Sequence, residues 1–230
     1  MQEVFIDIHT HSEQTPPPGS MAIRNIRLRH PYPIIPDNDL FTIGLHPWDT
    51  DEMSIDFDYL TKIAGMPNCL GIGECGIDRL RGTDFHRQAD IFKQQVLFAE
   101  QVKKPVFIHC VRAWLEIMKI KSEVSTTVPW IIHGYRGKAS TALQLIDKGF
   151  YLSFGESILS MNQVLSDILR KTPEDRLFLE TDDGKHSIQE IYQAASEIKN
   201  IPLAILKDIL NLNFNKVFKI NGPSGMAAKD

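Results

Sequence analysis

The stretch VFIHCVRAWLEIMKIKSEVSTTVPWIIHGY, residues 106–135, contains the pattern that decides the fold. Two short apolar segments, Val106–His109 and Trp130–His133, each end in one histidine, and Ala113–Ile120 between them has apolar residues at helical spacing. A strand, a helix and a second strand in this order predict a right-handed βαβ unit with parallel strands. Both histidines then lie at the same edge of the sheet.

The same alternation continues on both sides of this unit. Further strands are predicted at Val4–His9, Phe41–Leu45, Cys69–Glu74, Tyr151–Phe154 and Leu177–Glu180. Further helices are predicted at Phe85–Val102, Ser140–Lys148, Val164–Lys171, Ile188–Ile198 and Leu203–Phe218. Strands along the whole chain end in His, Asp or Glu, rather than a few strands near one switch point. This favours a closed α/β fold, a TIM-like (β/α) barrel, over an open doubly wound sheet.

The segment between residues 12 and 39 does not follow this alternation. It contains SEQTPPPG and HPYPIIPD, and because each proline removes a helix N–H donor, no full helix is expected there. Ala22–Leu28 is predicted to be the second strand. Ser12–Met21 is too short for a helical crossover but can run back extended, at about 3.1 Å per residue. We therefore predict a degenerate, shortened first β/α unit in a single barrel domain, residues 1–220, followed by a flexible tail, residues 221–230.

The composition is that of an ordinary globular protein. The 230 residues are 43% hydrophobic and 23% charged, without a membrane-length apolar run and without the features of a signal peptide at the N-terminus. Three cysteines, Cys69, Cys75 and Cys110, are odd in number and fit a reducing compartment, so a cytoplasmic location is expected. The net charge of −4 argues against a broad basic nucleic-acid face, but bound divalent cations can supply positive field locally.

The motif Asp7-Ile8-His9-Thr10-His11 places three polar side chains on one face of a strand, because side chains alternate with period two. Two imidazoles converging from one strand can bind a metal ion, although a histidine pair alone is as compatible with a core or surface pair. Asp7 lies deepest, and we expect it to orient a ligand histidine rather than to bind metal itself.

Glu74 lies among glycines in LGIGECGID, residues 70–78, at the predicted end of a strand. Burying a lone carboxylate is costly unless a cation meets it, and a position bridging two metals would satisfy that need. A glutamate that caps the next helix is the structural alternative. The glycines permit close backbone approach and unusual φ angles.

One histidine at the end of an apolar strand is more often a satisfied core residue than a ligand. His109 and His133 occur together with the pair at the start of the chain, which favours metal binding. The acidic end of LETDD, residues 179–183, adds Asp182, which is predicted to ligate metal and to take a proton from water. The nitrogen-rich set favours zinc or another transition ion, whereas magnesium prefers oxygen ligands.

His46 follows an apolar strand and precedes Pro47, which predicts a loop at the mouth of the barrel. Because histidine titrates near neutrality, His46 is expected to contact substrate or to protonate the leaving group, the alternative being an ordinary turn histidine. Arg112 and Arg136 each follow a strand-end histidine by three residues and are candidate phosphate contacts. Three arginines of the irregular segment are expected to add positive charge near the mouth: Arg24, Arg27 and Arg29. The alternative is that all of these are ordinary surface arginines.

Taken in order, these motifs resemble the TatD-like metal-dependent hydrolases of the amidohydrolase superfamily. The matching motifs, spread over roughly residues 4–218, are DIHTH at 7–11, GLHPW at 44–48, GIGECGID at 71–78, FIHC at 107–110, IIHGY at 131–135 and LETDD at 179–183. The resemblance implies two divalent metal ions, with zinc, magnesium and manganese as candidates. It implies that His9, His11 and Asp182 hold one ion, that His109 and His133 hold the other, and that Glu74 bridges them.

The resemblance also implies hydrolysis, often at DNA phosphodiester ends. We expect metal-assisted attack of water, with Asp182, Glu74 and His46 as the catalytic residues. The expected substrate contains phosphate, as single-stranded DNA, DNA ends or short oligonucleotides; neither a membrane nor an obligate protein partner is expected. Two alternatives are a metal-dependent hydrolase of C–N or ester bonds in a small molecule and a metal-binding protein without turnover. Two features depart from the family pattern and concern the identity of the substrate. The 12–39 segment is short, and the loop after Asp182 is short where the family has a long substrate loop.

Overall fold

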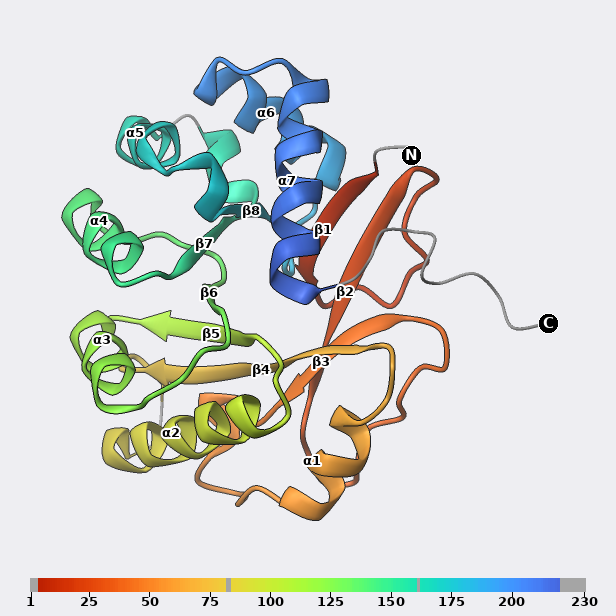
Figure 1. Cartoon of the computed structure of the whole chain (residues 1–230), viewed down its shortest axis with the longest axis vertical. Helices are drawn as coiled ribbons and strands as arrows, with labels where there is room; N and C mark the ends of the chain where they lie inside the picture. The colour runs from red at the N-terminus through yellow and green to blue at the C-terminus, as the bar shows by residue number, and fades with distance from the viewer. Residues whose placement is uncertain (1–3, 82–83, 161, 220–230) are drawn as a thin grey trace.

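Eight parallel strands form one sheet in chain order, β1 to β8, in a computed structural model that describes residues 4–81, 84–160 and 162–219 (Figure 1). The strands are β1 Phe5–Thr10, β2 Ser20–Arg27, β3 Leu40–Gly44, β4 Cys69–Asp78, β5 Val106–Val111, β6 Trp130–Ile132, β7 Tyr151–Phe154 and β8 Leu177–Leu179. A parallel bridge from Thr10 to Asp182 joins the two ends of the sheet, and the Asp182 N–H donates to the His9 carbonyl over 2.9 Å. The TIM-like barrel predicted from the strand ends is confirmed.

Helices follow six of the eight strands on the outside of the barrel. They are α1 Phe57–Ala64, α2 Phe85–Gln101, α3 Trp114–Glu123, α4 Ala139–Asp147, α5 Gln163–Lys171, α6 Ile188–Lys199 and α7 Leu203–Phe218, with 3₁₀ turns η1 Pro47–Asp49, η2 Glu156–Ser160 and η3 Glu174–Arg176. Helix α1 was not predicted, although the side chain of Asp56 caps it by accepting from the Tyr59 N–H, and Leu60 and Ile63 are buried at helical spacing. An aspartate before apolar residues at helical spacing was the sequence signal that could have predicted α1.

The connections from β1 to β2 and from β2 to β3 contain no helix, as the prolines predicted. Strand β2 begins two residues before the predicted start and ends one residue before the predicted end. The extended return is held by hydrogen bonds from the Phe5 N–H to the Gly19 carbonyl and from the Ser20 N–H to the Pro17 carbonyl. The space beside this segment is a cavity of about 450 Å³ that reaches His11 and Asp182. The shortened first unit therefore leaves one side of the barrel mouth open.

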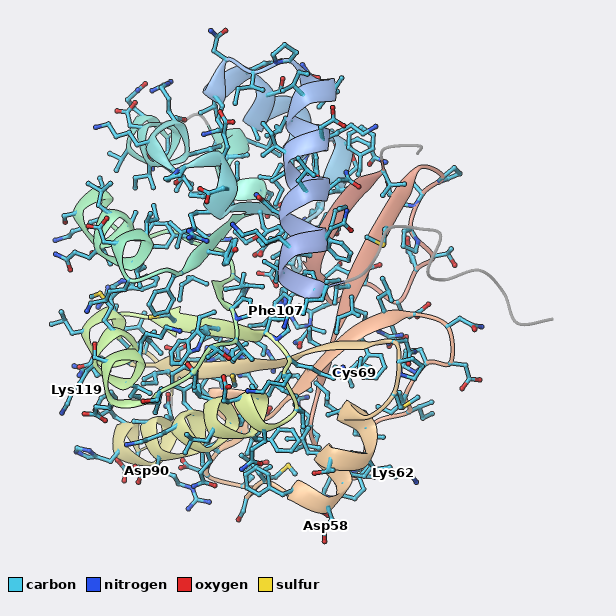
Figure 2. The ribbon with its side chains drawn as sticks, in the orientation of Figure 1. Asp58, Lys62, Cys69, Asp90, Phe107 and Lys119 are labelled. Carbon is cyan, nitrogen blue, oxygen red and sulfur yellow. The ribbon has the colours of Figure 1, made fainter. Side chains whose placement is uncertain are left out.

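The apolar core has two parts, one between the sheet and the helices and one inside the barrel. Phe107 lies in the interior, whereas Asp90 and Lys119 point outward from α2 and α3 (Figure 2). Helix α7 lies across the amino ends of the strands, where Phe218 stacks on Phe107 with 6.1 Å between ring centroids. The opposite, carboxyl end of the barrel is left for polar side chains.

Among the described residues, no helix is long and apolar enough to span a membrane. The tail predicted at residues 221–230 lies outside the described residues.

Candidate metal centre

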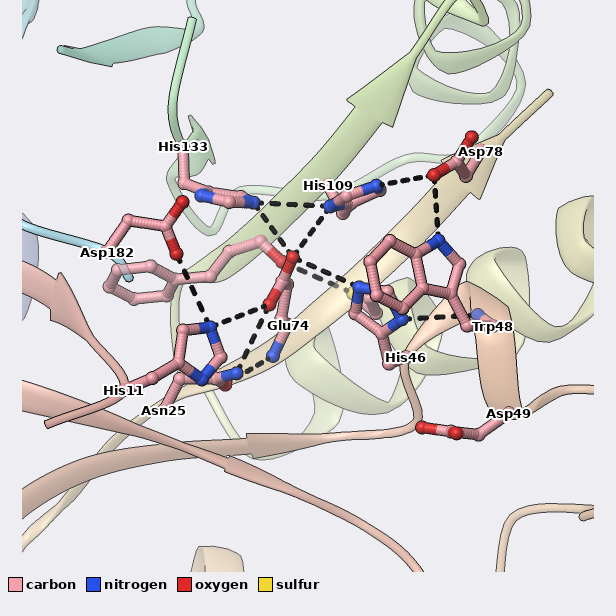
Figure 3. A network of polar contacts seen from close by, with 12 residues as sticks. His11, Asn25, His46, Trp48, Asp49, Glu74, Asp78, His109, His133 and Asp182 are labelled. Atoms are coloured by element: carbon pink, nitrogen blue, oxygen red, sulfur yellow. Dashed lines mark hydrogen bonds and ion pairs between the residues drawn. The ribbon is translucent and has the colours of Figure 1, made fainter. Parts of the chain in front are cut away.

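The carboxylate of Glu74 is the centre of a polar cluster inside the barrel mouth and is 2% exposed (Figure 3). Its Oε2 lies 3.7 Å from His9 Nε2 and 3.6 Å from His11 Nε2. Its Oε1 lies 2.7 Å from His109 Nδ1 and 2.8 Å from His133 Nε2. The two oxygens of one carboxylate therefore face two different pairs of histidines.

Asp182 completes the set from the last strand of the barrel. It lies just after β8, and its Oδ1 is 3.4 Å from His11 Nε2 and 3.7 Å from His9 Nε2. All six side chains predicted to bind metal thus converge in one place. The prediction that each stands at a strand end is only approximate, because ladder pairing between β4 and β5 continues to Asp78 and Val111, past Glu74 and His109.

The cluster is rich in electron-pair donors that face one another, which is the chemistry of a metal site. His9 is fully buried, and among the described residues neither of its ring nitrogens has a hydrogen-bond partner. Burial lowers the pKa of His9 to about 3, so its ring is neutral and offers a lone pair. Several groups of three side chains place ligand atoms within 4.8 Å of one another, among them His9, His11 and Glu74. The residues present fit a divalent cation.

Burial and mutual contacts act in opposite directions on the pKa values of this cluster. Burial alone would raise the pKa of Glu74, but His133 and His109 hold it well below its ordinary value. Burial opposes protonation of His11 and His133, yet hydrogen bonds to Asp182 and Glu74 raise the pKa of His11 to about 9, and Glu74 and Glu180 raise that of His133 well above its ordinary value. A cation entering the cluster would replace these protons.

The position of His46 corrects the expectation that it reaches substrate from a mouth loop. Its side chain is buried and caps η1, where Nδ1 accepts from the Trp48 N–H over 3.2 Å. Nδ1 is therefore the acceptor, so Nε2 carries the proton and donates to Glu74 Oε1 over 3.2 Å. Burial lowers the pKa of His46 to about 4. A neutral, buried histidine that supports Glu74 is not placed to protonate a leaving group.

Two carboxylates behind the histidines had not been predicted as site residues. Asp78 Oδ2 accepts from His109 Nε2 over 3.1 Å and from Trp48 Nε1 over 2.7 Å. Glu180 Oε1 lies 3.4 Å from His133 Nδ1, and its Oε2 has no partner among the described residues. Period-two spacing from Glu74 to Asp78, on one strand face, was the signal that could have revealed Asp78.

Asn25 of β2 is a third residue that sequence reasoning missed. Its Nδ2 donates to Glu74 Oε2 over 3.2 Å, while its Oδ1 accepts from the Glu74 N–H over 2.9 Å and from the Thr42 hydroxyl over 3.2 Å. Because Asn25 contacts both ends of Glu74, it sets the rotation of that carboxylate. No motif marks it, since the contact depends on β2 and β4 lying on either side of β3.

Asp7 does not orient an imidazole as expected. Its Oδ1 accepts from the backbone N–H of Thr181 over 3.0 Å and of His9 over 3.3 Å, and its Oδ2 accepts from the Thr181 hydroxyl over 2.6 Å. Burial raises the pKa of Asp7 to about 7. Asp7 therefore fastens the chain after β8 to β1, and its effect on His9 passes through the backbone.

Glycines on both sides of Glu74 allow β5 to approach β4 closely, as predicted. Gly73 and Gly76 have φ of 142° and 143°, and a Cβ on Gly76 would lie 2.0 Å from the His109 carbonyl oxygen. Side-chain-bearing residues rarely adopt this backbone conformation. The glycines thus let Glu74 and His109 meet.

The arginines near the mouth differ in whether a carboxylate pairs with them among the described residues. Arg112 and Arg136 are exposed and line a cavity of about 340 Å³ together with His109, His133 and Asp182. Two of the three arginines of the irregular segment do not supply free charge: Arg24 pairs with Glu13 and Asp39, and Arg29 pairs with Asp49. The expectation that Arg24 and Arg29 add positive charge near the mouth was therefore wrong.

An eight-stranded parallel barrel that gathers histidines and carboxylates around Glu74 at its carboxyl end defines a metal-dependent hydrolase. A sequence profile of the TatD related DNase family matches residues 30–219, and the chain belongs to this family. The matched range begins after the His9–His11 motif, in line with the short first unit.

Individual relatives agree with this assignment. The uncharacterized metal-dependent hydrolase YabD of Bacillus subtilis is 27% identical over 196 residues, which are 78% of this chain and 77% of YabD. A Citrobacter rodentium protein named 3'-5' ssDNA/RNA exonuclease TatD is 26% identical over 146 residues, 61% of this chain and 56% of its own. The crystal structure of the TatD homologue YjjV from Escherichia coli K12 has a TM-score of 0.76 at 20% identity, covering 96% of this chain and 100% of YjjV.

Proposed function

We propose that this hydrolase is a phosphodiesterase that acts on nucleic-acid ends or short oligonucleotides at a two-metal centre. The observation that carries the proposal is the division of the Glu74 oxygens, with Oε2 toward His9 and His11 and Oε1 toward His109 and His133. A carboxylate placed between two nitrogen pairs is the arrangement that bridges two cations. A single structural ion would not need both faces of Glu74.

In this proposal His9, His11 and Asp182 would hold one cation and His109 and His133 would hold the other, with Glu74 shared between the two. The cations supply Lewis acidity, which lowers the pKa of an attacking water and neutralises charge on phosphoryl oxygens. The four nitrogen ligands favour zinc or another transition ion, with manganese and magnesium as the other candidates.

Asp182 is the residue proposed to accept the proton of the attacking water. Its side chain is 29% exposed, so it borders solvent as well as His9 and His11. Burial would raise the pKa of Asp182, but His11, His133 and His9 keep it below the ordinary value of an aspartate. The carboxylate is therefore ionised at neutral pH and can act as a base.

Arg112 and Arg136 are the residues proposed to hold the phosphate. Both line the 340 Å³ cavity beside His109 and His133, and a guanidinium can donate two parallel hydrogen bonds to a phosphate. The relative named as an ssDNA/RNA exonuclease supports a nucleic-acid substrate. The open side of the mouth left by the short first unit supports a polymer end over a small enclosed molecule.

The test is a substrate panel with and without added Zn²⁺, Mn²⁺ or Mg²⁺. We expect hydrolysis of bis-p-nitrophenyl phosphate and of a single-stranded oligonucleotide, and loss of both activities with a chelator. Closed circular duplex DNA should resist cleavage. Rapid cutting of the circle would contradict action at ends, and activity on acyl-amides or esters alone would replace the phosphodiesterase with a small-molecule hydrolase.

Asp78→Asn is expected to weaken metal binding about 10–100-fold, the usual cost of losing a carboxylate behind a ligand histidine. The amide keeps the volume but removes the negative charge that His109 Nε2 and Trp48 Nε1 both contact. Metal affinity is measured by competition with a chromogenic chelator. Asp90→Asn, at an exposed position on α2, is the matched control. Equal affinities in the two variants would remove Asp78 from this role.

A further inference from the structure

The arginines at the carboxyl end of the barrel include a pair with a distinctive arrangement around one tryptophan. Arg27 is the last residue of β2, and its guanidinium carbon lies 5.0 Å from the centroid of the Trp48 ring. Arg81 follows β4 by three residues, and its guanidinium carbon lies 4.0 Å from the same ring. Within the described part of the chain, neither arginine has a carboxylate at ion-pair distance, in contrast to Arg24, Arg29, Arg79 and Arg170.

Trp48 is itself held rigidly beside the metal centre. Its Nε1 donates to Asp78 Oδ2 over 2.7 Å, and its ring packs edge-on against His46 and His109, with 4.6 and 5.8 Å between centroids (Figure 3). The indole is thus anchored through the same carboxylate that contacts His109. Guanidinium groups that lie on it are placed close to the reacting centre.

A guanidinium that lies over an aromatic ring is pre-organised while its N–H edge stays available. Two such groups around one indole, without carboxylate partners, form a site for an anion with several acceptor oxygens. Phosphate fits because each guanidinium can donate two parallel hydrogen bonds to it. Since the guanidinium groups lie over the ring, Trp48 serves as their scaffold rather than as a stacking surface for a base.

We propose that Arg27, Trp48 and Arg81 form a second phosphate subsite, separate from the cavity of Arg112 and Arg136. Arg112 and Arg136 follow β5 and β6. Arg27 ends β2, Trp48 follows β3 and Arg81 follows β4, so the two subsites occupy neighbouring arcs of the barrel mouth. This inference rests on the proposed phosphodiesterase function. It deepens that function by requiring a substrate with more than one phosphate, and therefore an oligonucleotide of two or more phosphodiesters.

Carboxylates gather at the mouth over β7 and β8, beside Arg136 of the first phosphate cavity. Asp182 and Asp183 follow β8, and Glu156 follows β7, where its Oε2 accepts from the Lys185 N–H over 3.0 Å. These carboxylates make the arc over β7 and β8 acidic. The arginines proposed to hold phosphate would therefore place the phosphate backbone of the substrate over β2 to β6: Arg27, Arg81, Arg112 and Arg136.

Binding without turnover tests the subsite directly. A fluorescein-labelled thymidylate octamer is titrated with metal-free protein in a chelator at several salt concentrations, and anisotropy is measured. Arg27→Gln/Arg81→Gln should weaken binding about 10-fold and should reduce the slope of log affinity against log salt by about 0.7, the value for one lost single-strand phosphate. Arg81→Gln alone, at an exposed position, should reduce the slope by less than the double variant does, because Arg27 remains. Arg170→Gln, which removes an arginine paired with Asp167 on α5, is the control.

Hydrolysis then separates this inference from the proposed function. For the double variant, the ratio of kcat/KM for the octamer to kcat/KM for bis-p-nitrophenyl phosphate should fall about 10-fold, because only the octamer reaches a second phosphate subsite. Unchanged salt slopes and an unchanged ratio, with wild-type protein active on both substrates, would overturn the subsite and leave the phosphodiesterase standing. Absence of phosphodiester hydrolysis in wild-type protein would instead overturn the proposed function. An equal fall for both substrates, with reduced metal content, would assign the arginines a structural role and also overturn the subsite.

Discussion

Replacing Glu74 with glutamine is expected to reduce hydrolysis by at least about 100-fold and to lower metal content in parallel. Loss of a residue behind a metal ligand already costs about 10–100-fold, and Glu74 lies between both histidine pairs. A neutral amide also offers only one oxygen, so its nitrogen would face either His9 and His11 or His109 and His133. Elemental analysis of purified protein gives the metal stoichiometry, and the substrate panel gives the rate.

The matched control for Glu74→Gln is Glu123→Gln, which removes a carboxylate on the exposed side of α3, where it pairs with Lys93. It should keep the wild-type metal stoichiometry and rate. A Glu74→Gln protein with full metal content would exclude the bridging role. If the wild type contains two ions and the Glu74→Gln protein contains about one, one of the two histidine pairs still binds an ion without Glu74.

Gly76→Ala is expected to destabilise the fold by about 3 kcal/mol or more and to disturb the metal centre at the same time. The alanine must adopt a positive φ and must also displace the His109 carbonyl, which would lie 2.0 Å from its Cβ. The backbone penalty and the overpacking penalty are each about 1–3 kcal/mol. At about 2–4 °C per kcal/mol for a chain of this size, Tm should fall by about 6–12 °C.

Gly149→Ala separates these two penalties. Gly149 has φ of 83°, but a Cβ there would meet no atom within 4 Å, so only the backbone penalty of about 1 kcal/mol applies. Its metal content should equal that of the wild type. Similar Tm losses for both variants, with metal content intact in Gly76→Ala, would show that close approach of β4 and β5 does not position His109.

The six side chains predicted to bind metal, which the structure brings together, could be picked out because each belongs to a local strand pattern. His9 and His11 share a face through period-two alternation, and His109 and His133 each follow a short apolar run. Parallel strands of a barrel bring their carboxyl ends together, so convergence followed from the fold class alone. The absence of a helix between β1 and β2 was predictable in the same way, because proline removes the N–H donors that a helix needs.

The role of His46 was not predictable in that way. A histidine before proline at a strand end has the local features of a mouth loop, yet its ring is turned inward and hydrogen-bonds Glu74. The Trp48 N–H, which assigns its tautomer, acts only once the η1 turn has formed. Burial, which no local pattern encodes, then decides that this histidine stays neutral.

The sequence alone determined the barrel class, the six side chains that converge at its mouth and the shortened first unit, since these follow from periodicity, apolar runs and proline chemistry along single segments. Only the tertiary structure decided which Glu74 oxygen faces which histidine pair, that Asp78, Glu180 and Asn25 stand behind the ligands, and which arginines lack carboxylate partners. These features depend on the register between strands and on side-chain directions at contacts between segments far apart in the chain, such as Asp7 with Thr181, 174 residues apart. A one-residue change of register would turn a side chain to the other face of its strand without altering any local pattern.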